Sequence, residues 1–311
     1  MEQKIKLVQK LFGLEQTGLQ DNHTKSAIKN FNIRDGSGSD DTLTDDVFNR
    51  IFAKFGVNVD EYEEVDMSND DITTDSEETT RIYMDYMLDS GEYVNSSKIT
   101  NKEYIFIHHT AGWDDPYSTI DSWNSDNRGR IGTHYVIGGS NIYKRKTNSE
   151  FNGMVLKCIP DEYWAYHLGG TKKHKIDFHM HSHSIGIELC NFGYLIERGQ
   201  AFYTYAGQRV DESEIFDLGY EFRGRRYWHS YSEEQINSLF FLLTQLSAKY
   251  NINKSNGLVD WLKNGDVVNA FDFKESARDG DVKGILSHTN VRNDKYDVYP
   301  HDGLVDMIKS L

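Results

Sequence analysis

The feature that most constrains the fold is an alternation of strand-like and helix-like segments over residues 101–311. Four runs rich in β-branched and aromatic residues predict strands: EYIFIHH, THYVIGG, SIGIELCNF and KGILSHT. The amphipathic segment SEEQINSLFFLLTQLSAKY predicts a helix capped by Ser232, with an apolar stripe of Ile236, Leu239, Phe240, Leu243 and Leu246. Such alternation favours an α/β (α+β) domain with a central mixed β-sheet flanked by helices.

Two segments interrupt this alternation. Residues 201–230 are aromatic and carry Arg223, Arg225 and Arg226, so we interpret them as an insertion between a strand and the long helix. A covering flap and an extended substrate wall are equally open roles for it. Residues 260–284 form a second predicted insertion.

Residues 1–56 predict three short amphipathic helices, which together make a small three-helix bundle. Asp21 is the expected cap of the second helix and Thr44 that of the third. The apolar faces are Ile5, Val8, Leu11 and Phe12 in the first helix, Ala27, Ile28 and Phe31 in the second, and Val47, Phe48, Ile51 and Phe52 in the third.

Most of the negative charge lies in one segment. Residues 57–100 hold 13 acidic and two basic side chains, and therefore −11 of the net charge of −15. The first half of this segment is typical of a linker, whereas RIYMDYMLDSGEYV is apolar enough to pack as a lead-in on residues 101–311. An acidic chain argues against a nucleic-acid partner, which requires a basic surface.

The chain contains no run of the roughly 20 apolar residues that span a bilayer. The N-terminal residues lack the apolar core of a secretory signal, so we expect synthesis in the cytoplasm. The two cysteines, Cys158 and Cys190, cannot form a disulfide framework.

Two strand ends carry potential metal ligands. One is YIFIHHTAG, with His108 and His109, and the other is ILSHTNVRNDKYDVYP, with His288 followed by Asp294 and Asp297. A catalytic zinc ion needs three protein ligands and an open fourth position, and imidazole and carboxylate both suit it. A lone histidine at a strand end is more often a packed or hydrogen-bonded residue, so these residues alone leave the question open.

The ordered set of motifs IHHTAG, THYVIGGSNIYK, WAYHLGG, SIGIELCN and SHTNVRNDKYDVYP resembles the zinc-dependent N-acetylmuramoyl-L-alanine amidases of type 2. That family shares its fold with animal peptidoglycan recognition proteins. The resemblance implies the zinc ligands His108, His288 and Asp297. Lys295 stands two positions before Asp297, as in the family, which favours Asp297 over Asp294.

The resemblance also implies hydrolysis of the amide between N-acetylmuramic acid and L-alanine by zinc-activated water. Family members take the base from a tyrosine, whose position is Thr133 here, or from a glutamate in the motif IGIEL, which is Glu188 here. We therefore expect Glu188 as the general base and Lys295 as the oxyanion donor. The expected substrate contacts are His167, Trp164, His134 and Thr133, although each of these could instead be a core residue.

Side chains alternate along a strand, so His108 and His109 face opposite sides. The family register selects His108 as the ligand and leaves His109 either to support the metal ligands or to pack in the core. We expect the histidine-rich run HKIDFHMHSHS to form a loop at the groove rim.

The segments VQKLFGLEQTGLQDNHTKSAIKNF and LTDDVFNRIF resemble the peptidoglycan-binding domain of cell-wall hydrolases, although DGSGSDDTLT replaces that family's second glycine turn. We expect three regions: 1–56 as the wall-binding domain, 57–100 as linker and lead-in, and 101–311 as the zinc amidase. The expected partner is peptidoglycan, both glycan strand and stem peptide, bound by a monomer without nucleic acid or membrane insertion. A phage lysin, released by a holin or carried on the virion, would fit. The alternatives are a non-catalytic recognition module and a structural phage tail component.

Overall fold

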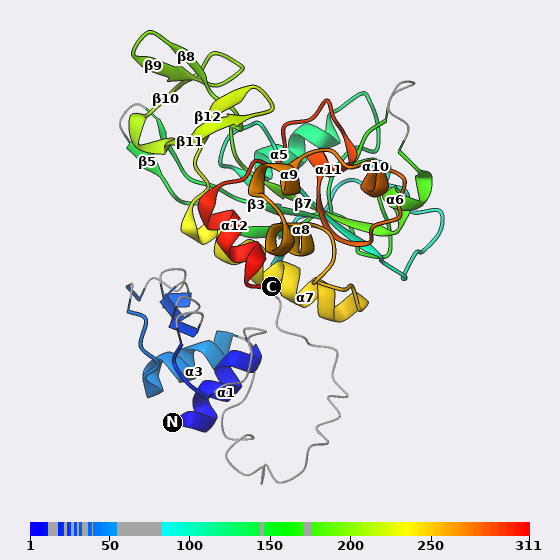
Figure 1. Cartoon of the computed structure of the whole chain (residues 1–311). Coiled ribbons are helices and arrows are strands. Elements are labelled where there is room, and N and C mark those ends of the chain that lie inside the picture. Colours follow the sequence, from blue (N-terminus) through cyan, green and yellow to red (C-terminus); the bar gives the residue numbers. More distant parts are fainter. Residues whose placement is uncertain are drawn as a thin grey trace. The chain divides into compact units, whose positions relative to one another are not determined.

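The computed structural model divides into two compact units, Met1–Ile82 and Tyr83–Leu311 (Figure 1). The residues that it describes are 1–11, 18–21, 24–25, 28–29, 31–32, 37–38, 40–54, 83–143, 146–170 and 176–311. Among them, no helix combines the length and apolar character that crossing a membrane requires.

The first unit contains the helices α1 (Glu2–Leu11) and α3 (Asp45–Lys54) among its described residues. Val8 and Ile51 are fully buried, and Lys4 Nζ lies 2.8 Å from Asp45 Oδ1. Asp21 Oδ1 accepts a hydrogen bond from the backbone N–H of Thr24 at 2.8 Å, as expected for a helix cap. Parts of the second predicted helix, and residues 55–82 of the predicted linker, lie outside the described residues. The three-helix bundle therefore stays a prediction.

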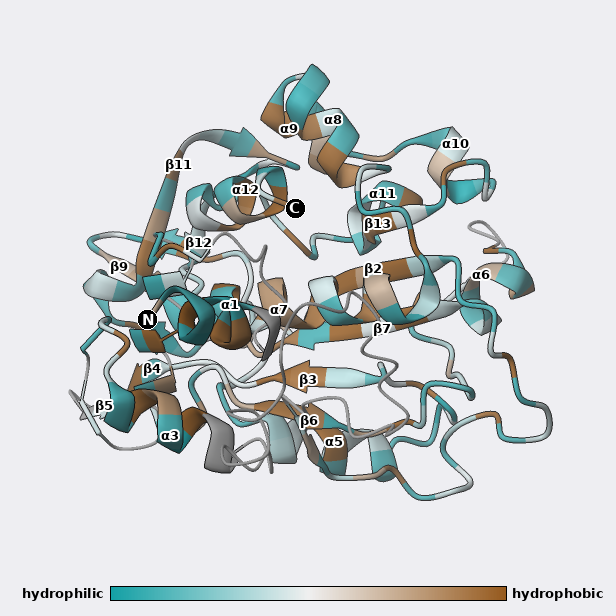
Figure 2. Cartoon of the chain, turned by 90° about the horizontal axis from the view of Figure 1, so that it is seen from below, coloured by the Kyte–Doolittle hydropathy of each residue, from teal (hydrophilic) through white to brown (hydrophobic). Residues whose placement is uncertain are grey.

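The second unit is built on a six-stranded mixed sheet with the order β1-β6-β3-β7-β2-β13. The strands are β1 (Met84–Asp85), β2 (Tyr104–His109), β3 (Tyr135–Ile137), β6 (Val155–Lys157), β7 (Ser184–Leu189) and β13 (Gly284–Ser287). β3, β7, β2 and β13 run parallel, whereas β6 is antiparallel to β3. Every residue of β2 is buried, as expected for a parallel strand covered on both faces. Figure 2 shows that much of this strand is hydrophobic.

Helices cover both faces of this sheet (Figure 1), which confirms the predicted fold class. α7, α8 and α12 pack on one another over one face, and α5 and α11 lie on the other. The helices are α5 (Pro116–Asn124), α6 (Phe178–Ser182), α7 (Glu233–Tyr250), α8 (Leu258–Asn264), α9 (Val267–Phe271), α10 (Glu275–Arg278), α11 (His288–Val291) and α12 (Asp302–Lys309).

The long helix α7 begins as predicted, because Ser232 Oγ accepts a hydrogen bond from the backbone N–H of Gln235 at 3.0 Å. Its predicted stripe needs one correction. Leu242 is buried, because the helix packs against both the sheet and α12 and so buries a wider arc than the predicted stripe. Phe240 is only partly buried. The predicted insertion at 260–284 contains most of α8, all of α9 and α10, and the start of β13.

Between β7 and α7 the chain leaves the main sheet (Figure 1). It first forms a three-stranded sheet of β8 (Ile196–Arg198), β9 (Ala201–Tyr203) and β10 (Arg209–Val210). A 3₁₀ turn, η1 (Glu212–Glu214), leads into a hairpin of β11 (Ile215–Phe222) and β12 (Arg225–His229). A smaller hairpin joins β4 (Asn141–Tyr143) to β5 (Lys146–Asn148).

Residues 83–100 belong to the second unit. β1 pairs with β6, and the backbone N–H of Leu88 donates to the carbonyl of Cys158 at 2.9 Å. Leu88 and Val94 are buried. The lead-in predicted at the end of the acidic segment therefore packs on the sheet, upstream of the predicted boundary at residue 101.

Candidate metal centre and active site

The site forms where parallel strands end. His108 is the penultimate residue of β2, Glu188 is its neighbour in register on β7, and His288 follows β13 directly. The carboxyl ends of parallel strands lie at the same edge of a sheet, where open α/β sheets bind their ligands. Three segments that are distant in the sequence therefore meet at one point.

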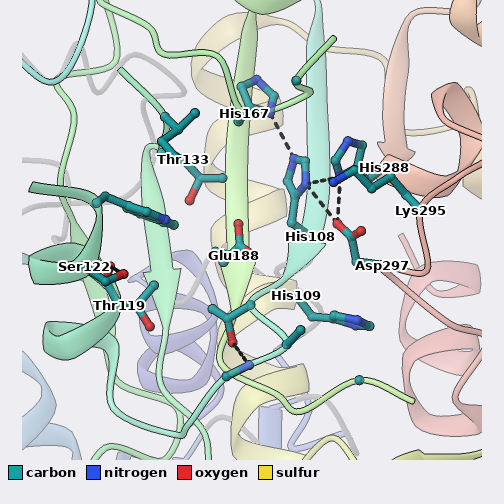
Figure 3. A pocket seen from close by; sticks show the side chains of 18 of the residues that line it. His108, His109, Thr119, Ser122, Thr133, His167, Glu188, His288, Lys295 and Asp297 are labelled. Atoms are coloured by element: carbon teal, nitrogen blue, oxygen red, sulfur yellow. Dashed lines mark hydrogen bonds and ion pairs between the residues drawn. The ribbon is translucent and has the colours of Figure 1, made fainter. Parts of the chain in front are cut away.

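The side chains of His108, His288 and Asp297 converge (Figure 3). His288 Nδ1 lies 2.9 Å from Asp297 Oδ2 and 3.1 Å from His108 Nδ1, and His108 Nδ1 lies 3.2 Å from the same carboxylate oxygen. No other set of three His, Cys, Asp or Glu donor atoms this close was found among the described residues.

The other nitrogen of His288 indicates what this cluster can hold. His288 Nε2 lies 3.0 Å from the carbonyl oxygen of Leu168. A carbonyl only accepts, so Nε2 donates to it, and Nδ1 is the nitrogen that faces the Asp297 carboxylate. These two atoms lie 2.9 Å apart, so that either a proton or a metal cation can be shared between them. Two imidazole nitrogens and one carboxylate oxygen are a common donor set of catalytic zinc, so the residues fit that metal.

Charge states agree with this arrangement. Burial lowers the pKa of His108 to about 4, so its imidazole is neutral at pH 7. Burial alone would raise the pKa of Asp297, but the neighbouring imidazoles of His288 and His108 outweigh it and hold that pKa well below its usual range. Neutral imidazoles and an ionised carboxylate are the forms that bind a metal.

His167 contacts the ring nitrogen of His108 that faces away from the donor cluster. His108 Nε2 lies 3.0 Å from His167 Nδ1, and His167 Nε2 lies 2.7 Å from Ser184 Oγ. Ligating histidines commonly have such a partner at the second nitrogen, which fixes ring orientation and tautomer. Gly186 leaves room for this contact, since a Cβ atom there would lie 2.9 Å from Thr133 Cγ2 and 3.1 Å from His167 Cγ.

The donor cluster opens into a cavity of about 640 Å³ that Glu188, Lys295, His167 and Thr133 also line. Burial raises the pKa of Glu188 well above its usual range, and the negative charge of Asp297 adds to this. α5 contributes Ser118, Thr119, Ser122 and Trp123 to the wall. Trp113, Phe192, Tyr194 and Tyr296 also line the cavity, and Trp113 is 43% exposed, so part of this aromatic lining faces solvent.

Two residues that were predicted to contact substrate, His134 and Trp164, do not line this cavity. His134 is fully buried, accepts from the backbone N–H of Gly186 at 3.1 Å and lies 3.0 Å from the carbonyl of Tyr163. Trp164 is 2% exposed and packs edge-on against Phe178. Both side chains therefore point into the core.

The competing carboxylate Asp294 lines the cavity, but Arg292 binds both of its oxygens at 2.7 Å. Asp297 is the carboxylate beside the histidines. In the histidine-rich run, His174 lies outside the described residues. His179 pairs with Glu103 at 2.9 Å and stacks on His183.

Sequence reasoning missed the aromatic residues around His109. The His109 ring lies in the cavity wall, with Nδ1 2.9 Å from Tyr231 Oη and its face near Trp228 and Tyr299. It also missed Arg223, whose side chain reaches the segment between His288 and Asp297. The only signal for Arg223 was its place in an arginine-rich insertion.

The family model for N-acetylmuramoyl-L-alanine amidase matches residues 98–300, which is more than half of the chain. No match was found among curated proteins. Among solved structures, PlyL is 13% identical with a TM-score of 0.35, over 69% of this chain and 85% of PlyL. The amidase LysCS from Clostridium intestinale is 15% identical with a TM-score of 0.37, over 73% and 93%. The E. coli amidase AmiD, in complex with a muramoyl peptide, is 20% identical with a TM-score of 0.30, over 52% and 49%. By the match to the family model, the chain belongs to the N-acetylmuramoyl-L-alanine amidase family.

Proposed function

We propose that this protein is a zinc-dependent peptidoglycan hydrolase that cleaves the amide bond between N-acetylmuramic acid and L-alanine. One observation carries the proposal. Two imidazole nitrogens and a carboxylate oxygen converge at the edge of a cavity that Glu188 and Lys295 also line, in a chain of the amidase family.

His108 and His288 would hold the metal through Nδ1, and Asp297 through Oδ2. Zinc, when bound, supplies a Lewis acid that lowers the pKa of water toward about 7 and polarises a carbonyl oxygen. The partners of the second nitrogens keep both rings oriented, since Leu168 accepts from His288 and His167 lies against His108.

Glu188 is the proposed general base. Its carboxylate accepts the proton of the attacking water as the new C–O bond forms at the lactyl carbonyl. The same carboxyl group then donates that proton to the nitrogen of L-alanine as the C–N bond breaks. Burial raises the pKa of Glu188, and a carboxylate with a raised pKa is the stronger proton acceptor.

Lys295 is the proposed donor to the oxyanion. Its ammonium group stabilises the negative charge that develops on the carbonyl oxygen, and it does so most strongly where water is excluded. Thr133 and His167 line the same cavity and would contact the muramoyl group or the peptide.

We also propose that residues 1–56 bind wall polymer and so raise the local concentration of substrate. Support comes from the resemblance of this segment to peptidoglycan-binding domains. A chain without residues 1–82 would then bind insoluble wall more weakly, while its kcat on a soluble muramoyl peptide stays unchanged.

The test of the proposed function uses purified peptidoglycan. We expect new amino groups of L-alanine to appear, to stop appearing after dialysis against a chelator, and to return when zinc is added. Binding to peptidoglycan without any release of amino groups would contradict hydrolysis and identify a recognition module instead.

A further inference from the structure

The ligands His288 and Asp297 stand at the two ends of one short segment, residues 288–297, here termed the ligand loop. Its only regular structure is α11, a single turn at His288–Val291. The backbone N–H of Thr289 donates to the carbonyl of Asp297 at 3.0 Å, which closes the loop. Lys295 also belongs to it. The geometry of the proposed site therefore depends on what holds this loop.

The side chain of Arg223, at the tip of the β11–β12 hairpin, contacts the loop backbone. Its Nη1 donates to the carbonyl of Lys295 at 2.6 Å and to that of Arg292 at 3.1 Å, and its Nη2 donates to the carbonyl of Thr289 at 3.0 Å. The side chain is only 9% exposed although it comes from a hairpin turn. One guanidinium thus joins three carbonyls of the ligand loop.

The Thr289 carbonyl in particular needs a donor, because it lies in α11 and a helix leaves its last carbonyl groups without intrahelical partners. The Arg292 carbonyl also accepts from the backbone N–H of Lys295, at 3.4 Å. A cation at a helix C-terminus also interacts favourably with the helix dipole. Asp272 lies 2.7 Å from Nη2 and balances the buried charge of Arg223. The guanidinium holds its five N–H donors in a rigid planar fork that reaches separated acceptors, whereas an ammonium group has three donors on a single atom.

The backbone at this position supports a specific role. Arg223 and Gly224 connect Phe222 to its partner Arg225, and Arg223 has a φ of +53°. A turn of this kind, with positive φ at both central residues, favours asparagine or glycine, and an L-residue with a side chain is strained there. The contacts with the ligand loop offset that strain.

The hairpin contacts the ligand loop and the residues beyond it at two more points. The guanidinium of Arg225 lies 4.2 Å from the ring centroid of Tyr194 and 5.9 Å from that of Tyr296. Trp228 stacks on Tyr299 with 4.5 Å between ring centroids, and Tyr299 Oη donates to the carbonyl of His229 at 2.6 Å. The hairpin therefore borders the segment that carries the second and third ligands along much of its length.

We propose that Arg223 is a positioning residue for the metal centre, through which the β11–β12 hairpin holds His288, Lys295 and Asp297 in their working arrangement. This inference rests on the proposed zinc site. It gives the 201–230 insertion a role distinct from a flap or a substrate wall.

The experiment compares the full chain with Arg223→Ala, Arg223→Lys and Arg226→Ala. Arg226 is the matched control, because it lies in the same hairpin, pairs with Asp217 at 2.7 Å and has a side chain that is 48% exposed. The measurements are the zinc dissociation constant, by competition with a chromophoric chelator, and kcat and KM on a soluble muramoyl peptide. Thermal unfolding of the metal-free proteins shows whether each variant folds.

We expect Arg223→Ala to weaken zinc binding about 10- to 100-fold, which is the usual effect of losing support behind metal ligands. kcat at saturating zinc should fall while KM changes little, because the loss affects Lys295 and the ligands rather than the proposed substrate contacts Thr133 and His167. Arg223→Lys should recover part of the zinc affinity, and Arg226→Ala should match the wild type.

Wild-type zinc affinity in a folded Arg223→Ala protein would overturn the inference and leave the proposed function intact. If Arg223→Ala does not fold, Arg223→Lys decides the question alone. A wild-type protein that binds no zinc would overturn both proposals.

Discussion

The two faces of strand β2 each carry a histidine at its C-terminal end, and the two rings have different surroundings. On one face, the His108 ring meets another imidazole and a carboxylate, with Nδ1 3.2 Å from Asp297. On the other, the His109 ring lies among aromatic rings, and Nδ1 meets the hydroxyl of Tyr231 at 2.9 Å. Both rings are buried, and burial lowers both pKa values to about 4. Burial and a shifted pKa therefore do not distinguish the two histidines, whereas the convergence of donor atoms around His108 does.

Removal of His108 is expected to have the largest effect. His108→Ala takes one donor from the cluster, so amide hydrolysis of peptidoglycan should fall to the uncatalysed background. His109→Ala should keep most of the activity at a temperature where it is folded. The release of L-alanine amino groups measures both variants, and equal losses would remove the proposed difference between the two faces.

Glu188 lies beside His108 in register but is no proposed ligand. Glu188→Gln keeps the shape of the side chain and removes the proton acceptor, so kcat should drop about 10²- to 10⁴-fold, the usual contribution of a general base. Zinc affinity should stay near that of the wild type. A large loss of zinc from this variant would place Glu188 among the ligands instead.

His109 should matter for stability rather than for metal binding. His109→Ala removes a buried ring and its hydrogen bond to Tyr231, so the free energy of unfolding should fall by about 2–4 kcal/mol. Urea unfolding of the metal-free proteins measures this. An unchanged midpoint would mean that the aromatic face tolerates the cavity and that His109 has no packing role.

The pH dependence of stability should reflect the core histidines. Burial lowers the pKa of His134 to about 3, against about 6.5 in an unfolded chain. Above pH 6.5 the residue is neutral in both states. As the pH falls from 6.5 toward 3, only the unfolded chain takes up the proton, so the free energy of unfolding decreases.

The variant His134→Gln can accept from Gly186 and donate to Tyr163 without titrating. Near pH 5, the free energy of unfolding of this variant should therefore lack the pH dependence that the uptake of about one proton by His134 causes in the wild type. Urea midpoints of the metal-free proteins across this range test the expectation, and identical pH profiles for variant and wild type would contradict it.

The sequence predicted the parts of the molecule that have a local pattern. β2, β7 and β13 are short apolar runs, and the capped start of α7 has its signature in Ser232. The family register also brought His108, His288 and Asp297 into one proposal. That the three donor groups lie together agrees with it, and their roles remain to be tested.

What the sequence could not predict depends on contacts between distant segments. Trp164 and His134 carry groups suited to a binding site, but whether they face the cavity or the core depends on how the loops before β3 and α6 pack. Arg223 contacts carbonyls of residues 289, 292 and 295, and backbone acceptors leave no trace in side-chain motifs. β1 has only two residues, which is too short for a periodic pattern that could predict the strand or its pairing with β6.

The most direct test of the account is the zinc content of three proteins after equilibrium dialysis: the wild type, His108→Ala and His109→Ala. We predict about one zinc ion per chain for the wild type and for His109→Ala, and almost none for His108→Ala, since two remaining donors hold zinc weakly. Full zinc content in His108→Ala, or its loss from folded His109→Ala, would contradict the assignment of the metal centre.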